Sequence, residues 1–173
     1  MTVKPIERVA WDAIESPLGP LALVVSERGV IAVSFVEVVS DGMIAELVPA
    51  GIRVARDRRA TRPLRRELEA YFVGKLTRFE TPVDPTGTDF QHHVWKALCT
   101  IPYGTTRTYG QVAKTIKKPQ ASRAVGMACH RNRIGIVIPC HRVVGAGGEL
   151  TGYAGGLDKK RFLLELEKKG GGA

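Results

Sequence analysis

The first part of the chain alternates apolar and polar residues in the way that is typical of strands. The alternation runs from Val9 to Phe35 and is interrupted by two turn-forming segments, Ser16–Pro20 and Ser26–Gly29. Successive side chains of a strand point to opposite faces, and proline, glycine and serine favour turns. The pattern therefore predicts an antiparallel hairpin or a small antiparallel sheet.

A helical period follows this region. Pro63 suits the first turn of a helix, and Gly74 is a residue that commonly follows the last turn. The apolar residues between them fall on one face at helical spacing: Leu64, Leu68, Tyr71 and Phe72. We expect one amphipathic helix here.

The next segment, Thr81–Asp89, reads TPVDPTGTD and is rich in proline, glycine and short polar residues. This composition is typical of a linker between domains. We place a domain boundary near Pro85, which gives an N-terminal sheet and helix domain over residues 1–85 and a C-terminal domain over residues 86–173. The predicted fold class is α/β of the α+β type.

The C-terminal domain is expected to be mainly helical. Thr88 and Gln91 have the spacing of a capping box, which satisfies free N–H groups at a helix start. An apolar stripe follows them, and Pro102 and Gly104 then stop the helix; the stripe comprises Phe90, Val94, Trp95 and Leu98. Two further short helices, over residues 109–116 and 121–131, flank the turn KKPQ at residues 117–120. Two short helices across a tight turn predict a helix-turn-helix.

A short apolar run ends at Pro139, and Cys140 follows at once. We interpret the run as a buried strand, because its residues are apolar and proline ends it; they are Ile134, Ile136, Val137 and Ile138. Cys140 is then held rigidly beside His141 and Arg142. Neighbouring imidazole and guanidinium groups favour a stored thiolate, the form that attacks carbon, so Cys140 is the candidate nucleophile.

Composition indicates an ordinary globular protein. The 173 residues are 44% hydrophobic, which is enough for one domain or two small ones. No apolar run reaches membrane-spanning length, and the N-terminal residues have no signal-peptide core, so we expect a cytoplasmic or nucleoid-associated protein. Cys99, Cys129 and Cys140 are an odd number without CxxC spacing, which indicates free thiols in a reducing compartment.

The net charge of +9 favours a polyanionic partner, although a solvated basic surface is the alternative. Residues 121–131 add a specific observation, because Arg123 is the one long cation among small residues in the first turns of this predicted helix. The small residues are Ala121, Ser122, Ala124, Gly126 and Ala128. They suit either tight packing against protein or close approach to a DNA groove, with Arg123 filling the place of an extruded base. The sequence pattern leaves both readings open.

Several motifs, in order and with consistent spacing, resemble the O6-alkylguanine-DNA alkyltransferase (methylated-DNA–protein-cysteine methyltransferase) family. The resemblance covers residues 87–168, whereas in residues 1–85 only the hairpin around SPLG is similar. The matching stretches are GTDFQHHVWKAL (87–98), IPYG (101–104), YGQVA (109–113), SRAVG (122–126), Asn132, IPCHRVV (138–144), TGYAGG (151–156) and LLELE (163–167). PCHR alone is moderately specific, and the ordered set is much more so.

The resemblance implies a reaction and the residues that perform it. Members of the family move an alkyl group from O6 of guanine irreversibly to their own cysteine, without an external cofactor. Cys140 would accept the group, His141 would take the thiol proton through a water, and Glu167 would hold and stabilise the imidazole. Asn132 would brace the turn before the cysteine. Tyr109 would press on a phosphate and assist proton delivery to the leaving guanine.

The resemblance also implies double-stranded DNA carrying O6-alkylguanine as the partner. The residues expected to bind DNA are Arg123, Tyr109, Gly110, Ser122, Ala124 and Lys118, and those expected to line the base pocket are Val143, Tyr153, Ala154 and Gly155. We expect a monomer in solution, and leave open both cooperative assembly along DNA and activity on O4-alkylthymine.

Metal binding, Cys129 and the arginine-rich segment are three further features of the sequence. Two Cys-His pairs, at residues 129–130 and 140–141, lack zinc-finger spacing, so we expect no metal; the N-terminal zinc of some family members should also be missing, because no cysteine precedes Cys99 and no histidine precedes His92. We hypothesise that Cys129 lies near the alkyl pocket. For the arginine-rich segment at residues 53–66 we favour a solvated basic surface over a second DNA contact.

Two rival functions are considered. The first is a DNA-binding regulator or a sensor of alkylated DNA without chemistry, which retention of Cys140 disfavours. The second is a cysteine hydrolase, which the Cys-His pair favours but the helix-turn-helix and the basic charge do not. Turnover distinguishes the three functions, since a sensor transfers nothing, an alkyltransferase transfers one equivalent and a hydrolase many.

Overall fold

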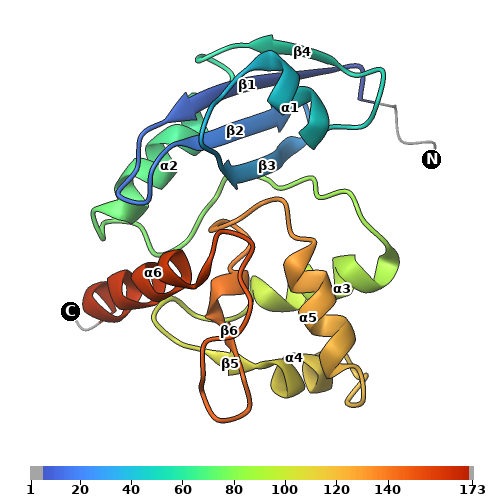
Figure 1. Ribbon diagram of the computed structural model, residues 1–173, viewed down its shortest axis with the longest axis vertical. Coiled ribbons are helices and arrows are strands. Elements are labelled where there is room, and N and C mark those ends of the chain that lie inside the picture. The colour runs from blue at the N-terminus through green and yellow to red at the C-terminus, as the bar shows by residue number, and fades with distance from the viewer. Residues whose placement is uncertain (1–5, 172–173) are drawn as a thin grey trace. The chain divides into compact units, whose positions relative to one another are not determined.

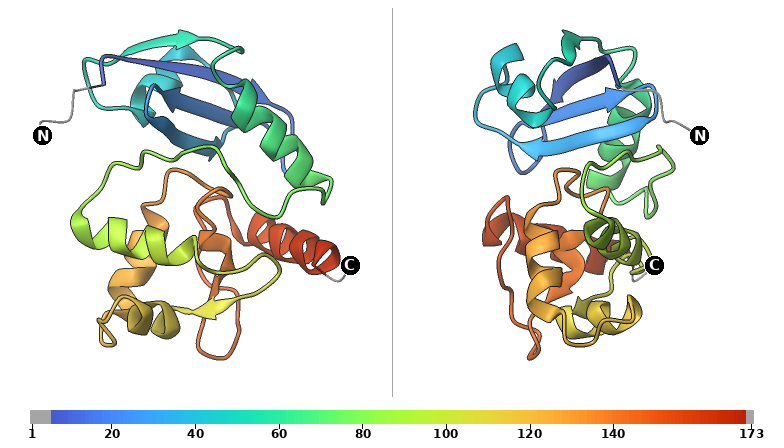
Figure 2. Two further views of the ribbon diagram at one scale, coloured as in Figure 1. Left: turned by 180° about the vertical axis from the view of Figure 1, so that it is seen from behind. Right: turned by 90° about the vertical axis from the view of Figure 1, so that its right-hand side faces the viewer.

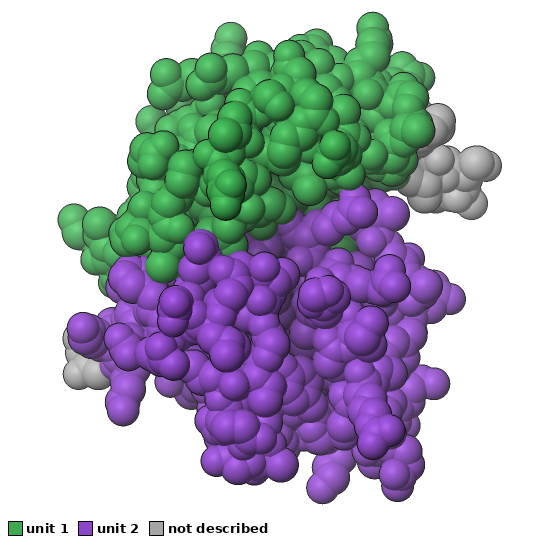
Figure 3. All heavy atoms as spheres, in the orientation of Figure 1, with its two compact units in different colours: residues 1–85 green, residues 86–173 purple. Residues whose placement is uncertain are grey.

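The computed structural model describes residues 6–171 and divides the chain into two compact units, Met1–Pro85 and Thr86–Ala173 (Figure 3). The architecture is mixed, with a small sheet and helices in the first unit and mainly helices in the second (Figure 1). The α+β class predicted from the sequence is confirmed.

The first unit is built on a four-stranded sheet. Its strands are β1 (Arg8–Ile14), β2 (Leu21–Ser26), β3 (Gly29–Phe35) and β4 (Arg53–Arg56), in the spatial order β3-β2-β1-β4. β1, β2 and β3 form the antiparallel meander that the alternation predicted, with turns at both expected places. β4 pairs with β1 in parallel, so the sheet is not purely antiparallel; this strand was not predicted from the sequence pattern.

The two faces of this sheet are covered by different helices, α1 (Asp41–Leu47) and α2 (Arg62–Phe72) (Figure 2). The α1 side forms a hydrophobic core from Val9, Trp11, Ala22, Val24, Ile31, Ala32, Ile44 and Val48. α2 is the amphipathic helix expected after Pro63, and it buries Leu64, Leu68 and Tyr71. α1 was not predicted; the Ser40 hydroxyl caps it by accepting from the Met43 N–H, and Ile44 is its one fully buried residue.

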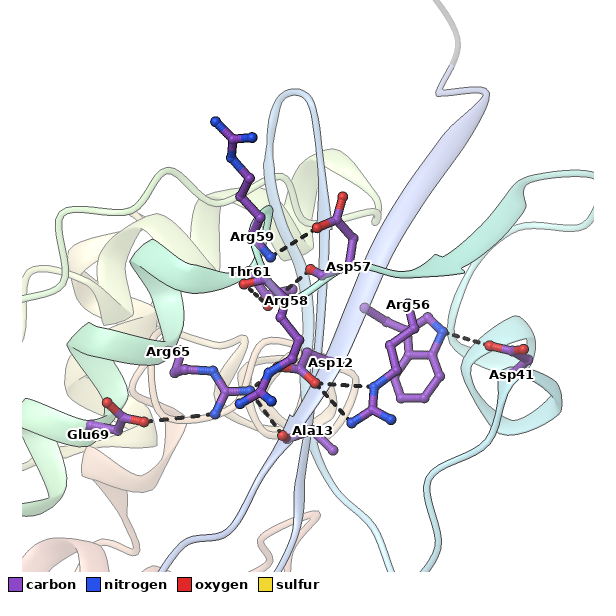
Figure 4. A network of polar contacts seen from close by, with 11 residues as sticks. Asp12, Ala13, Asp41, Arg56, Asp57, Arg58, Arg59, Thr61, Arg65 and Glu69 are labelled. Carbon is purple, nitrogen blue, oxygen red and sulfur yellow. Dashed lines mark hydrogen bonds and ion pairs between the residues drawn. The ribbon is translucent and has the colours of Figure 1, made fainter.

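A buried carboxylate organises part of the arginine-rich segment. Asp12 on β1 is inaccessible to solvent, and its oxygens pair with Arg56, Arg58 and Arg65 (Figure 4). Arg65 also donates to the Ala13 carbonyl oxygen at 3.2 Å, and only 18% of its side chain is exposed. The favoured interpretation of a solvated surface therefore fits the exposed side chains of Arg56 and Arg58 but is wrong for Arg65.

We predict that Asp12→Asn lowers the free energy of unfolding of the first unit by about 2–4 kcal/mol. Removing one partner of a buried ion pair leaves the other charge uncompensated, although Arg65 retains some access to water. Urea unfolding of the full chain, followed through the fluorine signal of 5-fluorotryptophan at Trp11, measures the change. Asp84→Asn is the matched control, since it breaks an exposed pair with Arg28 and should cost less than about 1 kcal/mol.

The second unit contains α3 (Asp89–Leu98), α4 (Tyr109–Thr115), α5 (Ser122–His130), a 3-10 turn η1 (Cys140–Arg142) and α6 (Leu157–Gly170). Two short strands, β5 (Arg107–Thr108) and β6 (Val143–Val144), pair in parallel. The capping box of Thr88 and Gln91 is present as expected, and Thr108 with Gln111 forms a second one at α4. The Trp95 indole N–H donates to the Ala128 carbonyl at 2.9 Å, which ties α3 to α5.

Candidate active site

Helices α4 and α5 form the predicted helix-turn-helix, and they pack on each other and on α3 (Figure 1). Lys117 in the connecting turn has a φ of 60°, a left-handed conformation that lets the chain reverse in few residues. The helices lie close together. A Cβ built on Gly110 would stand 3.7 Å from the Ser122 hydroxyl oxygen, and one on Gly126 would stand 3.8 Å from the Tyr109 ring.

The outer face of α5 is basic and small. Arg123 and Ala124 are exposed, whereas Val125, Ala128 and Cys129 are buried against the rest of the unit. The surrounding sequence carries no acidic residue between Asp89 and Glu149 but nine lysines and arginines. A segment with this excess of basic residues creates a positive potential that attracts a phosphate backbone.

The candidate nucleophile lies on η1, directly after Pro139. The apolar run before it is buried as expected, but residues 135–137 form a turn rather than a strand, so the predicted strand is wrong. Ile136 has a φ of 70°, which a β-branched residue rarely adopts. The run therefore fixes Cys140 by burying its side chains around a turn rather than in a regular strand.

Asn132 braces this turn. Its amide nitrogen donates to the Ile138 carbonyl at 2.9 Å and to the Cys140 sulfur at 3.2 Å, while its amide oxygen accepts from the Ile134 N–H at 2.9 Å. The side chain thus connects the end of α5 to the sulfur.

His141 and Glu167 form a buried pair beside the cysteine. The imidazole Nε2 and the Glu167 Oε1 are 2.7 Å apart, and neither side chain is accessible to solvent. Glu167 comes from the last turns of α6, so the pair joins η1 to that helix. Nδ1 of His141 is buried and has no hydrogen-bond partner among residues 6–171, which leaves it free to accept a proton.

Hydrogen bonds and positive charge from neighbouring side chains keep Glu167 ionised. Burial raises the pKa of this carboxyl, but hydrogen bonds and charge from His141 and Arg142 outweigh it and lower the pKa to about 2. Burial lowers the pKa of His141, with Glu167 acting in the opposite direction. The resting pair is therefore a carboxylate beside a neutral imidazole.

The expectation of a stored thiolate is not supported. Cys140 is only 6% exposed, and burial raises the pKa of its thiol, even though the Asn132 hydrogen bond and the charge of Lys160 lower it. The sulfur is thus held mainly as a thiol, which needs a base at the moment of reaction. The neighbours of Cys140 in the sequence suggested an ionised thiol, but burial has the larger effect on its pKa.

Lys160 was not predicted as a site residue from the sequence. Its side chain is fully buried, and Nζ donates to the Val143 carbonyl at 2.6 Å and to the Thr151 carbonyl at 2.7 Å. It lies near Cys140 and Cys129, whose charges raise the pKa of its ammonium against the larger effect of burial. The available signal was its spacing, since Lys160, Leu163 and Glu167 share the buried face of α6.

We predict that Lys160→Met raises the pKa of the Cys140 thiol by about one unit or more, because a nearby cation favours the thiolate. The pH dependence of carboxamidomethylation by iodoacetamide, with the Cys140 peptide quantified by mass spectrometry, measures this pKa. Lys168→Met is the matched control, as it removes an exposed lysine from the same helix and should leave the titration unchanged.

The other predicted site residues separate into two groups. The first group follows Cys140 in the chain. Val143 is fully buried on β6, and the pKa of Tyr153 is raised by burial and by Cys140 and Glu167. Ala154 and Gly155 follow Tyr153 in the turn before α6. The second group belongs to the helix-turn-helix: Gly110, Lys118, Ser122, Arg123 and Ala124.

Tyr109 connects the two groups. It begins α4, its hydroxyl accepts from the Thr151 hydroxyl at 3.1 Å, and its pKa is raised by burial and also by Cys129 and Cys140. Cys129 is itself buried and coupled to Cys140, and both burial and that coupling raise the pKa of its thiol. Cys129 thus lies close enough to the candidate nucleophile to interact with it electrostatically, and its place beside the alkyl pocket stays a prediction. Among the described residues no group of three or more His, Cys, Asp or Glu residues is arranged to hold a metal ion.

Fold and site together define a two-unit α+β protein that combines a helix-turn-helix with a buried cysteine and a His-Glu pair. Residues 89–169 match the family described as 6-O-methylguanine DNA methyltransferase, DNA binding domain. Residues 9–85 match its companion, the ribonuclease-like domain of 6-O-methylguanine DNA methyltransferase. The chain belongs to this methyltransferase family.

Curated relatives agree with the family match. The chain is 51% identical over 158 residues to the methylated-DNA–protein-cysteine methyltransferase of Methanosarcina barkeri, covering 91% of this chain and 96% of that protein. It is 46% identical over 160 residues to the protein of the same name from Mycobacterium bovis, covering 92% and 93%. The chain is accordingly an enzyme of this type.

Solved structures give the same result. The Mycobacterium tuberculosis O6-methylguanine methyltransferase has a TM-score of 0.82 at 45% identity, covering 93% of both chains. The crystal structure of Mycobacterium tuberculosis OGT in complex with DNA has a TM-score of 0.81 at 45% identity, covering 94% of both chains. Within residues 6–171, no helix of this chain combines the length and apolarity needed to cross a bilayer.

Proposed function

We propose that this protein repairs duplex DNA by transferring the alkyl group of O6-alkylguanine to Cys140, once per molecule. The observation that carries the proposal is that the Cys140 sulfur accepts a hydrogen bond from the Asn132 amide, while the next residue, His141, forms a buried pair with Glu167. A relative solved in complex with DNA supports the nucleic-acid partner.

The chemistry assigns a role to each group. The Sγ–C bond forms as the C–O6 bond breaks, and the electron pair of that bond goes to guanine. The thiol proton passes to Nδ1 of His141 through a water, and the Glu167 carboxylate stabilises the imidazolium through Nε2. Tyr109 donates a hydrogen bond toward the guanine, whose developing negative charge must be neutralised before it can leave.

The target base must leave the helix stack, because a duplex hides the O6 substituent. Extrusion costs a few kcal/mol. We propose that α5 lies along a DNA groove with its small residues and that Arg123 fills the vacated space. Phosphate contacts from Ser122, Lys118 and the Gly110 backbone then offset the cost. Val143, Tyr153, Ala154 and Gly155 then surround the extruded base.

The product explains why one molecule acts once. Attack of sulfur on an sp³ carbon leaves a thioether, which has no carbonyl that water could attack. The protein is therefore consumed. We place it in the cytoplasm with the chromosome and expect it to act as a monomer, with no cofactor; O4-alkylthymine is a second substrate to test.

The decisive experiment incubates the protein with duplex DNA containing O6-methylguanine labelled in the methyl group. We expect label on the peptide that contains Cys140, reaching a plateau at about one equivalent per chain. Continued release of label into solution would indicate a hydrolase, and no transfer with tight binding would indicate a sensor. Either result would overturn the proposal.

A further inference from the structure

Arg142, next to His141 on η1, makes its hydrogen bonds to groups inside the protein. Its Nε donates to Glu167 Oε2 at 2.9 Å, its Nη2 to Glu167 Oε1 at 2.9 Å, and its Nη1 to the Ile101 carbonyl at 2.7 Å. The residue is 6% exposed. A guanidinium held at both oxygens of a carboxylate is a rigid, charge-assisted pair, and here it faces inward rather than toward any DNA-binding surface.

The Glu167 carboxylate that binds Arg142 also binds the His141 imidazole. Glu167 Oε1 contacts His141 Nε2 at 2.7 Å, and Oε2 accepts from the Gly104 N–H at 3.1 Å. Gly104 has a φ of 74°, and a Cβ there would stand 3.1 Å from the Glu167 carbonyl oxygen. The carboxylate is thus fixed from three sides, so its position and charge are set before any substrate arrives.

The electrostatic consequence concerns His141. A bare buried carboxylate at hydrogen-bond distance favours an imidazolium, whose Nδ1 would carry a proton and could not accept another. With Arg142 bound to both oxygens, the negative charge of Glu167 is balanced, and the hydrogen bond fixes the tautomer without attracting a second proton. Glu167 therefore orients the imidazole ring, while Arg142 prevents the carboxylate from drawing a second proton onto it.

Other charged or titratable groups face this pair from the neighbouring elements. Lys160 on α6 acts on His141 in the same direction as Arg142, lowering the pKa of the imidazole together with burial. Tyr103, in the loop after α3, and Tyr153, before α6, face Glu167, and burial together with that carboxylate raises the pKa of both phenols, which keeps them neutral. Cys140 is held as a thiol. Arg142 differs from Lys160 in that its guanidinium donates directly to both carboxylate oxygens.

We propose that Arg142 is a positioning residue for alkyl transfer, which acts through Glu167 to keep His141 neutral at rest with Nδ1 open as a proton acceptor. The catalytic meaning of this inference rests on the proposed function. The protonation state of His141, however, is a property of the free protein and can be measured without DNA.

The test is the replacement Arg142→Gln, which removes the charge but keeps an amide able to donate to Glu167. Nitrogen-15 NMR of the full-length chain follows the His141 ring through pH. We expect its pKa to rise by about one unit or more. The acidic limb of the pH profile for single-turnover transfer should move upward by a similar amount. Arg142→Lys should restore the pKa of His141, because the charge returns. Arg161→Met, which removes an exposed arginine paired with Asp158, should shift nothing.

An unchanged His141 titration in Arg142→Gln would overturn the inference. If that variant does not fold, Glu167→Gln tests the same balance from the other side: Arg142 then lacks its counter-charge, and the pKa of His141 should fall below its value in the unaltered protein. A constant value there would also overturn the inference. The two proposals fail separately, since an unaltered chain that transfers no alkyl group contradicts the repair function whatever the His141 titration shows.

Discussion

Cys140→Ala is expected to abolish alkyl transfer completely while leaving affinity for duplex DNA within about twofold. The side chain is buried and belongs to the wall of the site, whereas the basic face of α5 lies on a separate helix. Removing one sulfur atom from the core costs little stability compared with removing a large side chain. Labelled transfer and a binding titration at fixed salt, performed on the same preparation, measure both quantities.

Cys129 supplies the matched control for this prediction. It is a second buried thiol near Cys140, but burial and the neighbouring sulfur raise its pKa, and no Asn132-like donor contact to its sulfur is seen among the described residues. Cys129→Ala should therefore retain about one equivalent of transfer. Label appearing on the Cys129 peptide in the Cys140→Ala variant would contradict the assignment of a single nucleophile.

Local signals explain which elements the sequence could predict. The meander of β1 to β3 follows from alternation and two turns, and α3 follows from a capping box and an apolar stripe, all within a few residues of each other. β4 has four residues and pairs in parallel with a strand about 45 positions earlier, so no short-range pattern identifies it. α1 is short and buries a single residue fully, which leaves almost no periodicity to detect.

The apolar run before Cys140 shows the limit of such reasoning. Burial of Ile134, Ile136 and Ile138 was predicted correctly, but a short apolar run does not specify its backbone. Here Ile136 adopts a positive φ and the chain turns, with Asn132 satisfying the polar groups that a sheet would otherwise pair.

The residues of the site also divide into those that local sequence patterns predicted and those that they did not. Asn132, Cys140 and His141 lie within ten residues and belong to recognisable motifs, so their association was predictable. Lys160 and the double hydrogen bond of Arg142 depend on how α6 packs, which no local pattern encodes. The charge state of Cys140 was predicted wrongly for a related reason, since neighbours in sequence are visible but desolvation is a tertiary property.

Glu167→Ala should destabilise the second unit by about 3–5 kcal/mol, because it leaves the buried guanidinium of Arg142 and the imidazole of His141 without their acceptor. The full chain contains one tryptophan in each unit, Trp11 and Trp95, so 5-fluorotryptophan labelling gives a separate fluorine signal for each during urea unfolding. The Trp95 transition should move to lower urea while the Trp11 transition stays in place.

Glu165→Ala is the control for this prediction, since it removes an exposed carboxylate one half-turn earlier on α6 and should change the free energy of unfolding by less than about 0.5 kcal/mol. A loss below about 1 kcal/mol for Glu167→Ala would show that the buried network contributes little to folding. In that case its role would be confined to orienting His141.

The pH dependence of stability provides the same test without mutation. The pKa of Glu167 in the folded chain, about 2, lies below its ordinary value of 4.5, so the carboxylate contributes stability that is fully present above pH 4.5 and is lost as the pH falls toward 2. That lowering of the Glu167 pKa corresponds to about 3 kcal/mol of folding free energy.

The pKa of His141 is also lowered, from 6.5, so the stability that the neutral imidazole contributes is likewise lost on acidification, but the loss begins nearer pH 6.5. The Trp95 transition should therefore weaken in two stages on acidification. Glu167→Ala should abolish the stage below pH 4.5, and persistence of that stage would assign it to another carboxyl.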